Sequence, residues 1–429
     1  MLHSCFNVWY IVLYTKESAM LEKLRELSCQ FLKIKNFSYE RYLIRNQKFT
    51  HRMSIIVGPR GVGKTATIVQ LLLKKVGGDR FNKKILYIQA DHFILAEMSL
   101  YEIAEQFQMY GGKWLAIDEI HKYPQWSKEL KSIYDTFPDL ELLISGSSAL
   151  EIYKGTHDLI RRSVTYSMQG MSFREYLELA YTIEAPAYSL EAICQDHQKI
   201  ADTIVKQIEG LQKKVLLEFS KYQKNGFYPY FFEIMDADAY KMTLEQNFHM
   251  TIESDLSSIY PHLTGTSIKK IKQLLIFIAK SVPFTPNWNK IASALEIGDV
   301  RTLKSYFAHL EDANLIKTIS RASLKLSQIE STDKVYLDNP NQLFAISSED
   351  PEIGNVRETF FLSMLSQNHK VQLPINGDFL VDGRYLFEVG GKKKTFKQIK
   401  SEENGFLACD DMEIGIGNKI PLWLFGFLY

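Results

Sequence analysis

The residues best suited to chemistry lie in one short glycine-rich loop. Residues 58–65 read G-P-R-G-V-G-K-T and fit the pattern G-x-x-x-x-G-K-[ST], which is typical of a phosphate-binding loop. Glycines in such a loop let the backbone turn so that successive N–H groups point at phosphate oxygens. We expect Lys64 to reach the β- and γ-phosphates of ATP, and the Thr65 hydroxyl to bind Mg²⁺. The candidate ATP-binding residues are Gly58, Pro59, Arg60, Gly61, Val62, Gly63, Lys64 and Thr65.

Two adjacent acidic residues form the second candidate group. Asp118 and Glu119 directly follow the apolar run 114–117, which suits a strand buried on both faces. Such a strand places both carboxylates at its carboxyl end, beside the phosphate-binding loop. There Asp118 can hold Mg²⁺, while Glu119 orients and polarises an attacking water. With Lys64 as a further catalytic residue, the acids predict hydrolysis of ATP.

Serines and arginines later in the chain are candidates for contacts with the γ-phosphate. The serine cluster 145–148 ends the next apolar run, and we take Ser147 as its catalytic candidate, although a small-residue turn is an alternative explanation. Arg161 or Arg162 can stabilise the charge of the transition state, from its own subunit or from a neighbour. The alternative is a pair of solvated surface arginines. The sequence does not choose between the two arginines.

Strands alternate with helices around these residues. The expected strands are 53–57, 84–90, 113–118, 140–145 and 163–169. The expected helices between the first four strands are 65–76, 96–109 and 126–136. This alternation predicts an α/β fold with a parallel sheet covered by helices on both faces.

The rest of the chain predicts further modules. Helical patterns fill 173–225 and 238–258, and three helices over 268–280, 287–295 and 299–312 precede two strands near 315 and 334. Three short helices followed by a strand pair predict a winged helix-turn-helix. After residue 355 we expect one helix and then strands over 378–389, 405–409 and 422–428.

Domain boundaries follow from these changes of pattern. We expect an ATPase core over 20–178, a helical lid or linker over 179–262, a winged-helix-like domain over 263–346 and a small α+β domain over 347–429. An ordinary amphipathic helix begins at Met20. We therefore expect residues 1–19 to be a non-native or disordered extension.

Composition limits the class of protein. The chain has 429 residues, which is too long for one ordinary domain, and its net charge of +1 gives no overall preference for polyanions. The four cysteines, Cys5, Cys29, Cys194 and Cys409, have no C-x-x-C spacing, which argues for a reducing compartment and against a zinc site. The largely apolar run 5–14 is too short to span a bilayer and lacks a basic flank, so we expect a cytoplasmic protein without a membrane anchor.

The order of motifs resembles that of prokaryotic AAA-type ATPases with a C-terminal domain of unknown function. The resemblance rests on the segments 58–65, 116–121, 144–148, 161–162 and 171–176. It implies a P-loop NTPase core, a winged-helix module and a C-terminal region related to restriction-endonuclease-like folds. Biological roles in that family are largely undefined, so the resemblance says more about architecture than about purpose.

The C-terminal region carries its own acidic residues. Asp378, Asp382, Glu388 and Lys392 are similar to the acid, acid, lysine set of PD-(D/E)xK nucleases, with Glu358 as a further potential metal ligand. In active members the lysine lies two residues after the glutamate, whereas Lys392 lies four residues after Glu388. We therefore expect a degenerate nuclease fold used for binding or assembly, and whether nuclease chemistry is retained stays open.

Basic residues raise the question of partners. The segments 287–317, with Arg301, Lys304 and Lys317, and 392–400 suit contacts with DNA, although such modules also bind proteins. Our leading hypothesis is a Mg²⁺-dependent ATPase that couples hydrolysis to rearrangement of the C-terminal modules. The alternative is a nucleotide-gated switch that binds DNA or protein with little turnover. A small-molecule kinase is disfavoured because no acceptor site is evident. The oligomeric state and the process served stay open.

Overall fold

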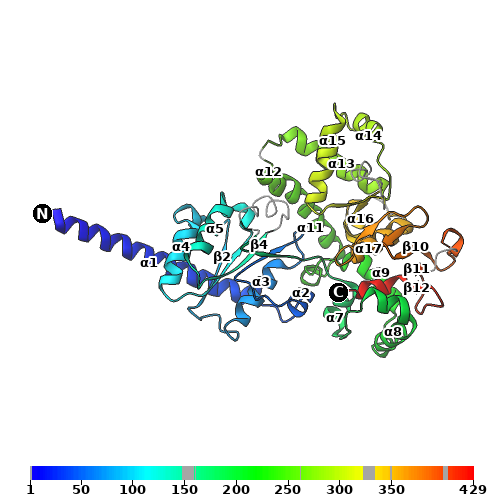
Figure 1. Ribbon diagram of the computed structural model, residues 1–429, viewed down its shortest axis with the longest axis horizontal. Helices are drawn as coiled ribbons and strands as arrows, with labels where there is room; N and C mark the ends of the chain where they lie inside the picture. The colour runs from blue at the N-terminus through cyan, green and yellow to red at the C-terminus, as the bar shows by residue number, and fades with distance from the viewer. Residues whose placement is uncertain are drawn as a thin grey trace. The chain divides into compact units, whose positions relative to one another are not determined.

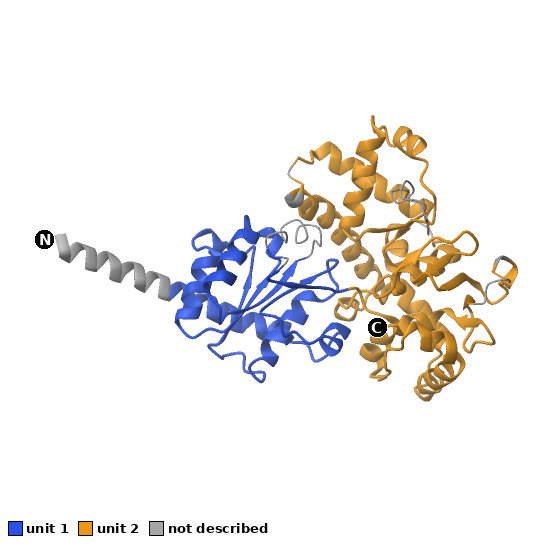
Figure 2. Cartoon of the chain, viewed as in Figure 1, with its two compact units in different colours: residues 1–168 blue, residues 169–429 orange. Residues whose placement is uncertain are grey.

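The chain folds into two compact units. The computed structural model describes residues 2–146, 159, 161–260, 262–321, 334–347, 350–399 and 404–429. The first unit comprises residues 1–168 and the second residues 169–429 (Figure 2). In the described part of the chain, no helix is both long enough and apolar enough to cross a membrane.

A parallel sheet forms the centre of the first unit. Its strands are β1 (Met53–Val57), β2 (Ile85–Gln89), β3 (Trp114–Asp118), β4 (Glu141–Gly146) and β5 (Val164–Ser167). Their order in the sheet is β2-β3-β4-β1-β5. Figure 1 labels β2 and β4 of this sheet. All five predicted strands are confirmed. The sheet and its flanking helices have the P-loop NTPase fold, with the phosphate-binding loop directly after the inner strand β1.

Helices cover both faces of this sheet. They are α1 (Leu2–Lys35), α2 (Tyr42–Asn46), α3 (Lys64–Lys74), α4 (Leu100–Met109) and α5 (Trp126–Thr136), with short 3-10 turns η1 (Phe93–Ala96) and η2 (Ile120–Lys122). Alternate strand residues, such as Ile55 and Ile117, share one buried cluster with α4, α5 and Leu24 of α1. The helix α3 contacts β3 and β4. The helix that we expected to begin at Met20 is continuous with residues 2–19.

The helix α1 also lies along β2, the edge strand of the sheet. Its Ser28 Oγ accepts a hydrogen bond of 2.9 Å from the backbone N–H of Tyr87. An edge strand exposes unpaired backbone donors, and a covering helix is one way in which proteins satisfy them. The N-terminal helix therefore covers this edge strand and accepts one of its backbone hydrogen bonds.

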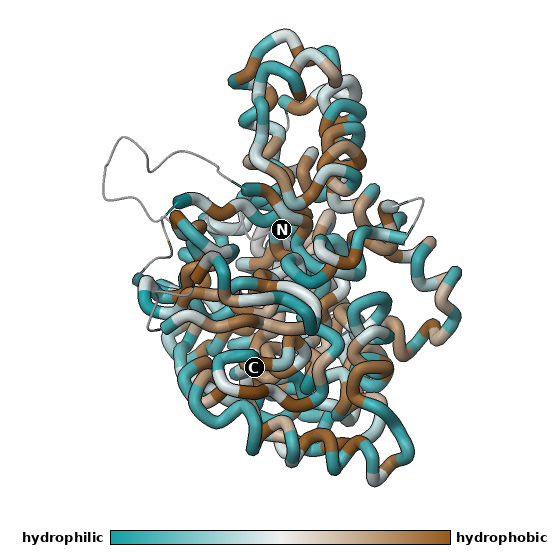
Figure 3. The backbone as a smooth tube through the Cα atoms, turned by 90° about the vertical axis from the view of Figure 1, so that its right-hand side faces the viewer, coloured by the Kyte–Doolittle hydropathy of each residue, from teal (hydrophilic) through white to brown (hydrophobic). Residues whose placement is uncertain are grey.

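The second unit begins with helices. They are α7 (Phe173–Tyr181), α8 (Leu190–Gly210), α9 (Val215–Asn225), α10 (Phe231–Ile234), α11 (Ala237–Met250), the π-helical turn η4 (Thr251–Asp255) and α12 (Leu256–Ile259). Figure 3 shows hydrophilic and hydrophobic residues alternating along many helices, as expected for helices with one buried face. Phe173 is fully buried and contacts the rings of Phe219, Tyr222 and Trp423. This aromatic cluster joins the first helices of the unit to the end of the chain.

Three helices and a strand pair follow. They are α13 (Gly265–Ser281), α14 (Trp288–Ala294), α15 (Val300–Asp312), β6 (Ile316–Ile319) and the antiparallel β7 (Lys334–Leu337). The predicted elements are therefore present in the predicted order. Residues 322–333 lie outside the described residues. The assignment as a winged helix stays a prediction.

A second sheet ends the chain. After α16 (Pro340–Ile346) and α17 (Ile353–Leu365) come β8 (Val371–Gln372), β9 (Phe379–Val381), β10 (Tyr385–Gly391), β11 (Gly405–Asp410) and β12 (Lys419–Pro421), with a 3-10 turn η6 (Phe396–Gln398). The sheet order is β12-β11-β10-β9-β8. The predicted helical region and the small α+β region are thus present.

Two predicted strands of this region differ from the structure. Residues 378–389 form two strands rather than one, because Asp382 and Gly383 both have positive φ and make a turn between them. The strand expected over 422–428 is wrong: Leu422–Phe427 form the 3-10 helix η7, which contacts α7, α8 and α17. A short apolar run reads equally well as a buried strand or a buried helix, and here packing between helices decides.

Candidate active site

The phosphate-binding loop connects β1 to α3. Gly61 and Gly63 have φ of 85° and 98°, in the left-handed region that glycine adopts without steric cost. Lys64 is 5% exposed, and its Nζ donates to the carbonyl oxygens of Gly58 and Pro59, at 2.9 and 2.7 Å. The lysine therefore folds back over the loop, with its charge beside the N-terminus of α3. A helix N-terminus and a buried ammonium both favour a bound phosphate.

Gly58 is required by a close approach of two backbone segments. A Cβ atom at this position would lie 2.1 Å from the carbonyl oxygen of Met168, which follows β5. Met168 in turn donates its N–H to the Val57 carbonyl at 2.7 Å. No side chain fits at residue 58 unless one of these two backbone segments moves.

Arg41 braces the loop from outside. It is 4% exposed, and its guanidinium donates to the carbonyl oxygen of Val62 within the loop. A charged donor on a loop carbonyl limits the motion of the loop. Nothing in the sequence around residue 41 singles out this arginine.

Asp118 connects the loop to the sheet. The carboxylate is 1% exposed, and its Oδ2 accepts hydrogen bonds of 2.7 Å from both the Thr65 hydroxyl and the Tyr87 hydroxyl. Its Oδ1 accepts from the Ser145 hydroxyl and, at 3.2 Å, from the Glu119 N–H. Buried carboxylates are stable only when hydrogen bonds replace water, and these four donors do so.

Glu119 follows Asp118 in an unusual backbone conformation. Its φ is 55°, which is uncommon for a residue with a side chain and costs of order 1–3 kcal/mol. The Glu119 N–H also donates to Ser145 Oγ at 3.2 Å. The side chain is 20% exposed, so water can reach this carboxylate. Strained backbones of this kind cluster at functional sites.

Two basic side chains lie beside the Glu119 carboxylate. Lys122 Nζ lies 3.6 Å from Glu119 Oε2 and donates to Asp91 Oδ2 at 2.6 Å. The buried His121 has its Nε2 3.8 Å from the same Glu119 oxygen. Burial acts to lower the pKa of Lys122, but its hydrogen bond to Asp91 and the charge of Glu119 outweigh burial and raise that pKa. Lys122 is thus held as a cation next to Glu119.

The donor set fits Mg²⁺. Thr65 and Asp118 offer a hydroxyl and a carboxylate, which are the oxygen ligands that Mg²⁺ prefers. Across the described ranges no three His, Cys, Asp or Glu side chains are grouped so that they could hold a metal. Mg²⁺ commonly binds through one or two protein oxygens together with substrate phosphates and water, so two ligands beside a phosphate-binding loop are sufficient.

The structure separates the two arginines from this group. Arg161 and Arg162 precede β5, which runs parallel to β1 and pairs with residues 54–57. They therefore lie at the amino end of the sheet, whereas the loop leaves its carboxyl end. Arg162 forms two hydrogen bonds of 2.8 Å with Asp135, while Arg161 is exposed. Neither arginine can reach the phosphate-binding loop of its own unit.

The serine cluster is described only in part. Ser147 lies outside the described residues. Ser145 is fully buried and contacts both acids of the site. Its role follows from register: Ile144 pairs with Ile117, so Ser145 lies opposite Asp118 on the same face. Aligning the ends of the predicted strands 113–118 and 140–145 would have pointed to Ser145 as well.

The C-terminal acids form a separate cluster. Asp378 lies opposite Glu388 across β9 and β10, and its Oδ2 accepts the Val389 N–H at 2.8 Å. Burial and the charge of Glu358 raise the pKa of Asp378. The lysine beside Glu388 is Lys394, at 2.9 Å, rather than Lys392.

The lysine position in this cluster depends on a glycine. A Cβ at Gly390 would lie 2.8 Å from the Lys394 side chain, so the glycine leaves room for the lysine to fold back over β10. Lys392 is exposed. Asp382 lies in the turn and pairs with His369 at 2.7 Å, away from Glu388. The four residues singled out in the sequence are therefore not one group.

The basic residues considered for DNA contacts are partly engaged within the chain. Lys317 pairs with the buried Asp338 at 2.6 Å. Lys304 lies over the Trp288 ring, 5.4 Å from its centroid. Arg301 and Lys304 are exposed on α15. The exposed basic surface is thus smaller than the sequence suggested.

The segment that contains the site matches a known domain family. Residues 50–177 match the AAA domain family. The match contains the phosphate-binding loop, both acids and both arginines. Residues 50–177 are therefore similar to AAA domains, and the sheet of the first unit has the P-loop NTPase fold.

The chain is also similar to an archaeal protein. It is 25% identical over 424 residues to the uncharacterized protein MJ1637 of Methanocaldococcus jannaschii, with 91% of this chain and 86% of that protein covered. This similarity extends beyond the AAA-type domain into the second unit. It concerns architecture, because the name assigns no activity.

Three solved structures are similar to this chain, each with a low TM-score. DnaA from Aquifex aeolicus bound to AMPPCP has a TM-score of 0.25 at 15% identity, with 63% of this chain and 84% of that chain covered. A Thermotoga maritima protein related to the DNA polymerase III gamma subunit has a TM-score of 0.26 at 11% identity, over 66% and 99%. For Caenorhabditis elegans PCH-2 the TM-score is 0.22 at 14% identity, over 41% of this chain and about half (52%) of that chain. The fold assignment rests on the sheet and the loop instead.

The Asp91–Lys122 pair makes stability depend on pH. Burial acts to raise the pKa of Asp91, but the hydrogen bond and the charge of Lys122 outweigh it and lower that pKa. A lowered carboxyl pKa stabilises the fold above the unfolded pKa, about 3.9, and this contribution is lost as pH falls through the folded pKa. For Lys122, with its raised pKa, the contribution is present below the unfolded pKa, about 10.4, and is lost as pH rises through the folded pKa.

We therefore expect Asp91→Asn to lower the free energy of unfolding by up to about 1 kcal/mol at pH 7, as for a partly exposed ion pair. The difference from wild type should begin to shrink as the pH falls below the unfolded pKa, about 3.9, and should vanish once the pH is below the lowered pKa of folded Asp91. Urea unfolding at several pH values measures it, with the exposed Asp139→Asn as control. A gap for Asp91→Asn that is the same at acidic and neutral pH would contradict the pairing.

Proposed function

We propose that the chain binds Mg²⁺-ATP at residues 58–65 and hydrolyses it with Glu119 as general base. The observation that carries this proposal is the hydrogen bond of 2.7 Å between Thr65 and Asp118, with Glu119 next in the chain. This bond joins the phosphate-binding loop to the pair of carboxylates at the carboxyl ends of the same parallel strands. A loop alone binds phosphate, whereas the adjacent acids add a metal ligand and a base.

The protein side chains divide the work. Lys64 exchanges its two loop carbonyls for phosphate oxygens, and the N–H groups of the loop and of α3 add further donors. Glu119 orients the attacking water and accepts its proton as the water oxygen bonds to the γ-phosphorus. The bond from that phosphorus to the bridging oxygen breaks, and ADP leaves with that oxygen. Ser145 fixes the Glu119 backbone through its N–H. Lys122, with its Nζ 3.6 Å from Glu119 Oε2, restrains the Glu119 carboxylate by electrostatic attraction.

Mg²⁺ supplies charge neutralisation. Thr65 and Asp118 would hold the ion, and its positive charge would offset the negative charge that develops in the transition state. The hydrogen bond from Thr65 to Asp118 leaves the lone pairs of the threonine oxygen for the metal. The two side chains therefore suit a shared role.

We also propose that hydrolysis drives or gates a rearrangement of the C-terminal modules. Support comes from the size of the second unit, residues 169–429, which is larger than the ATPase unit. The alternative is a nucleotide-gated switch that binds DNA or protein with little turnover. The internal pairing of Lys317 weakens the DNA alternative, and we rank hydrolysis first.

Removing the base should separate binding from turnover. We expect Glu119→Gln to bind ATP as wild type does but to hydrolyse it at least about 100-fold more slowly, since general-base catalysis contributes about 10²–10⁴-fold. Phosphate release gives the rate, and calorimetry gives the affinity.

The matched control is Glu105→Gln, which changes an exposed glutamate on α4 of the same unit. It should leave both quantities unchanged. Turnover by Glu119→Gln at the wild-type rate would show that Glu119 is not the base.

The position of the arginines supports action in a neighbouring subunit. Arg161 lies at the amino ends of the parallel strands, whereas the loop lies at their carboxyl ends. Only a second copy of the chain can therefore present Arg161 to a γ-phosphate. Arg162 is engaged by Asp135, so we assign the role to Arg161. This assignment requires assembly in the presence of ATP.

Complementation tests this assignment. Arg161→Ala and Lys64→Ala should each be nearly inactive alone, because one lacks the arginine and the other the site. Mixed in equal amounts they should regain part of the activity, roughly a quarter or less, by the arithmetic of mixed interfaces. Arg162→Ala, the control, should retain most of its turnover. Wild-type turnover by Arg161→Ala would contradict the assignment.

A further inference from the structure

Tyr87 is a buried residue of the site that the roles described above do not use. It lies on β2, opposite Ala116 of β3, so its side chain is on the same face of the sheet as Asp118, two residues further on. The residue is 3% exposed, and its hydroxyl lies 2.7 Å from Asp118 Oδ2. A tyrosine from the edge strand thus reaches the carboxylate at the end of the neighbouring strand.

The Tyr87 hydroxyl donates to Asp118. A phenol has one O–H donor, and the oxygen of Tyr87 lies 2.7 Å from the carboxylate oxygen Oδ2 of Asp118. Asp118 Oδ2 therefore receives two hydrogen bonds, one from Tyr87 and one from Thr65. Two fixed donors on one oxygen restrict rotation of the carboxylate.

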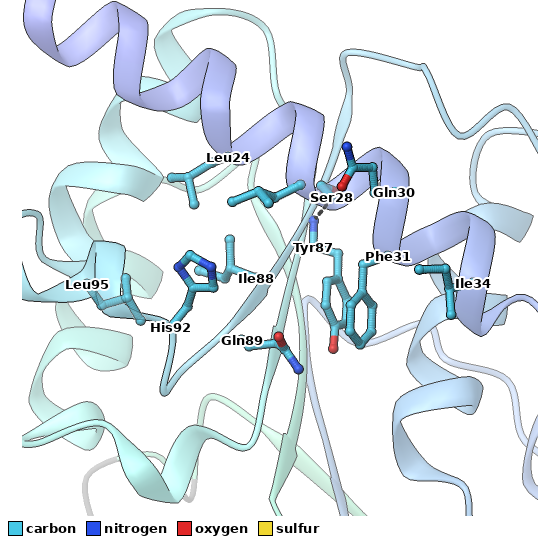
Figure 4. Close-up of a pocket in the computed structure, with 11 residues that line it drawn as sticks. Leu24, Ser28, Gln30, Phe31, Ile34, Tyr87, Ile88, Gln89, His92 and Leu95 are labelled. Atoms are coloured by element: carbon cyan, nitrogen blue, oxygen red, sulfur yellow. Dashed lines mark hydrogen bonds between the residues drawn. The ribbon is translucent and has the colours of Figure 1, made fainter.

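The N-terminal helix supports the tyrosine ring. Phe31 of α1 stacks on Tyr87, with ring centroids 4.5 Å apart and an angle of 11° between the planes. Ser28 of the same helix accepts the Tyr87 N–H. Figure 4 shows both contacts at one wall of a pocket of about 150 Å³, which α1 and the end of β2 line. The ring is therefore held on its outer side by a helix and cannot easily follow a carboxylate that turns away.

We propose that Tyr87 is a positioning residue for the magnesium ligand Asp118, with α1 as the support that holds the tyrosine in place. The inference rests on the proposed ATPase function and deepens it. Tyr87 touches neither the loop nor Glu119 by any hydrogen bond among the described residues, so it acts through Asp118 alone. Its effect should therefore appear in the use of Mg²⁺ and not in the binding of the phosphates themselves.

Tyr87→Phe removes the hydroxyl and keeps the ring that stacks on Phe31. We expect kcat to fall roughly tenfold. The Mg²⁺ concentration for half-maximal activity should rise several-fold, because the carboxylate is no longer held where Thr65 and the metal meet. ATP affinity measured in EDTA should stay at the wild-type value, because the loop is intact. A loss of folded protein alone would leave the Mg²⁺ requirement unchanged.

Two further variants complete the test. Tyr123→Phe is the matched control: it removes a tyrosine hydroxyl that donates to Glu129 at 3.0 Å in the same unit, and its kinetics should equal those of wild type. Phe31→Leu removes the ring support without touching the hydroxyl. It should raise the Mg²⁺ requirement in the same direction as Tyr87→Phe but by less.

The outcomes separate this inference from the proposed function. A Tyr87→Phe chain with wild-type kcat and Mg²⁺ requirement overturns the inference alone. If wild type binds Mg²⁺-ATP without hydrolysing it, the same comparison is made on the gain in ATP affinity that Mg²⁺ provides, which Tyr87→Phe should reduce. A wild-type chain that binds no nucleotide overturns the proposed function and this inference with it.

Discussion

The first unit depends on keeping one buried carboxylate satisfied. Asp118 is almost inaccessible to solvent, and an unpaired charge in that position would cost several kcal/mol. Four donors reach it, from the loop, from both neighbouring strands and from the following residue. Each donor is a residue with a place in the site, so the requirement for stability and the requirement for chemistry coincide.

The sheet order explains how these donors converge. β3 lies between β2 and β4, so Tyr87 and Ser145 flank Asp118 from either side. β1 is the neighbour of β4 in the sheet, and the loop after β1 brings the Thr65 hydroxyl to the same carboxylate. The helix α1 closes the outer edge behind Tyr87. Moving any one of these strands would leave the carboxylate short of a donor.

The sequence predicted the parts of this arrangement that depend on local pattern. Buried strands and the glycine-rich loop have strong local signatures, so all five strands of the first sheet were located. Tyr87 was missed because its role depends on which strand is the neighbour of β3, which no local pattern specifies. Lys394 was missed because it reaches Glu388 by folding back over Gly390. The 3-10 helix over 422–427 was read as a strand, since only packing between helices separates the two.

Replacement of Asp118 tests the central claim most directly. Asp118→Asn keeps the size of the side chain but removes the charge that pairs with Mg²⁺. ATP affinity in EDTA should match wild type, while turnover at saturating Mg²⁺ should fall roughly 100-fold, as when a preorganised electrostatic group is removed. Equal turnover by Asp118→Asn and wild type at every Mg²⁺ concentration would contradict the account.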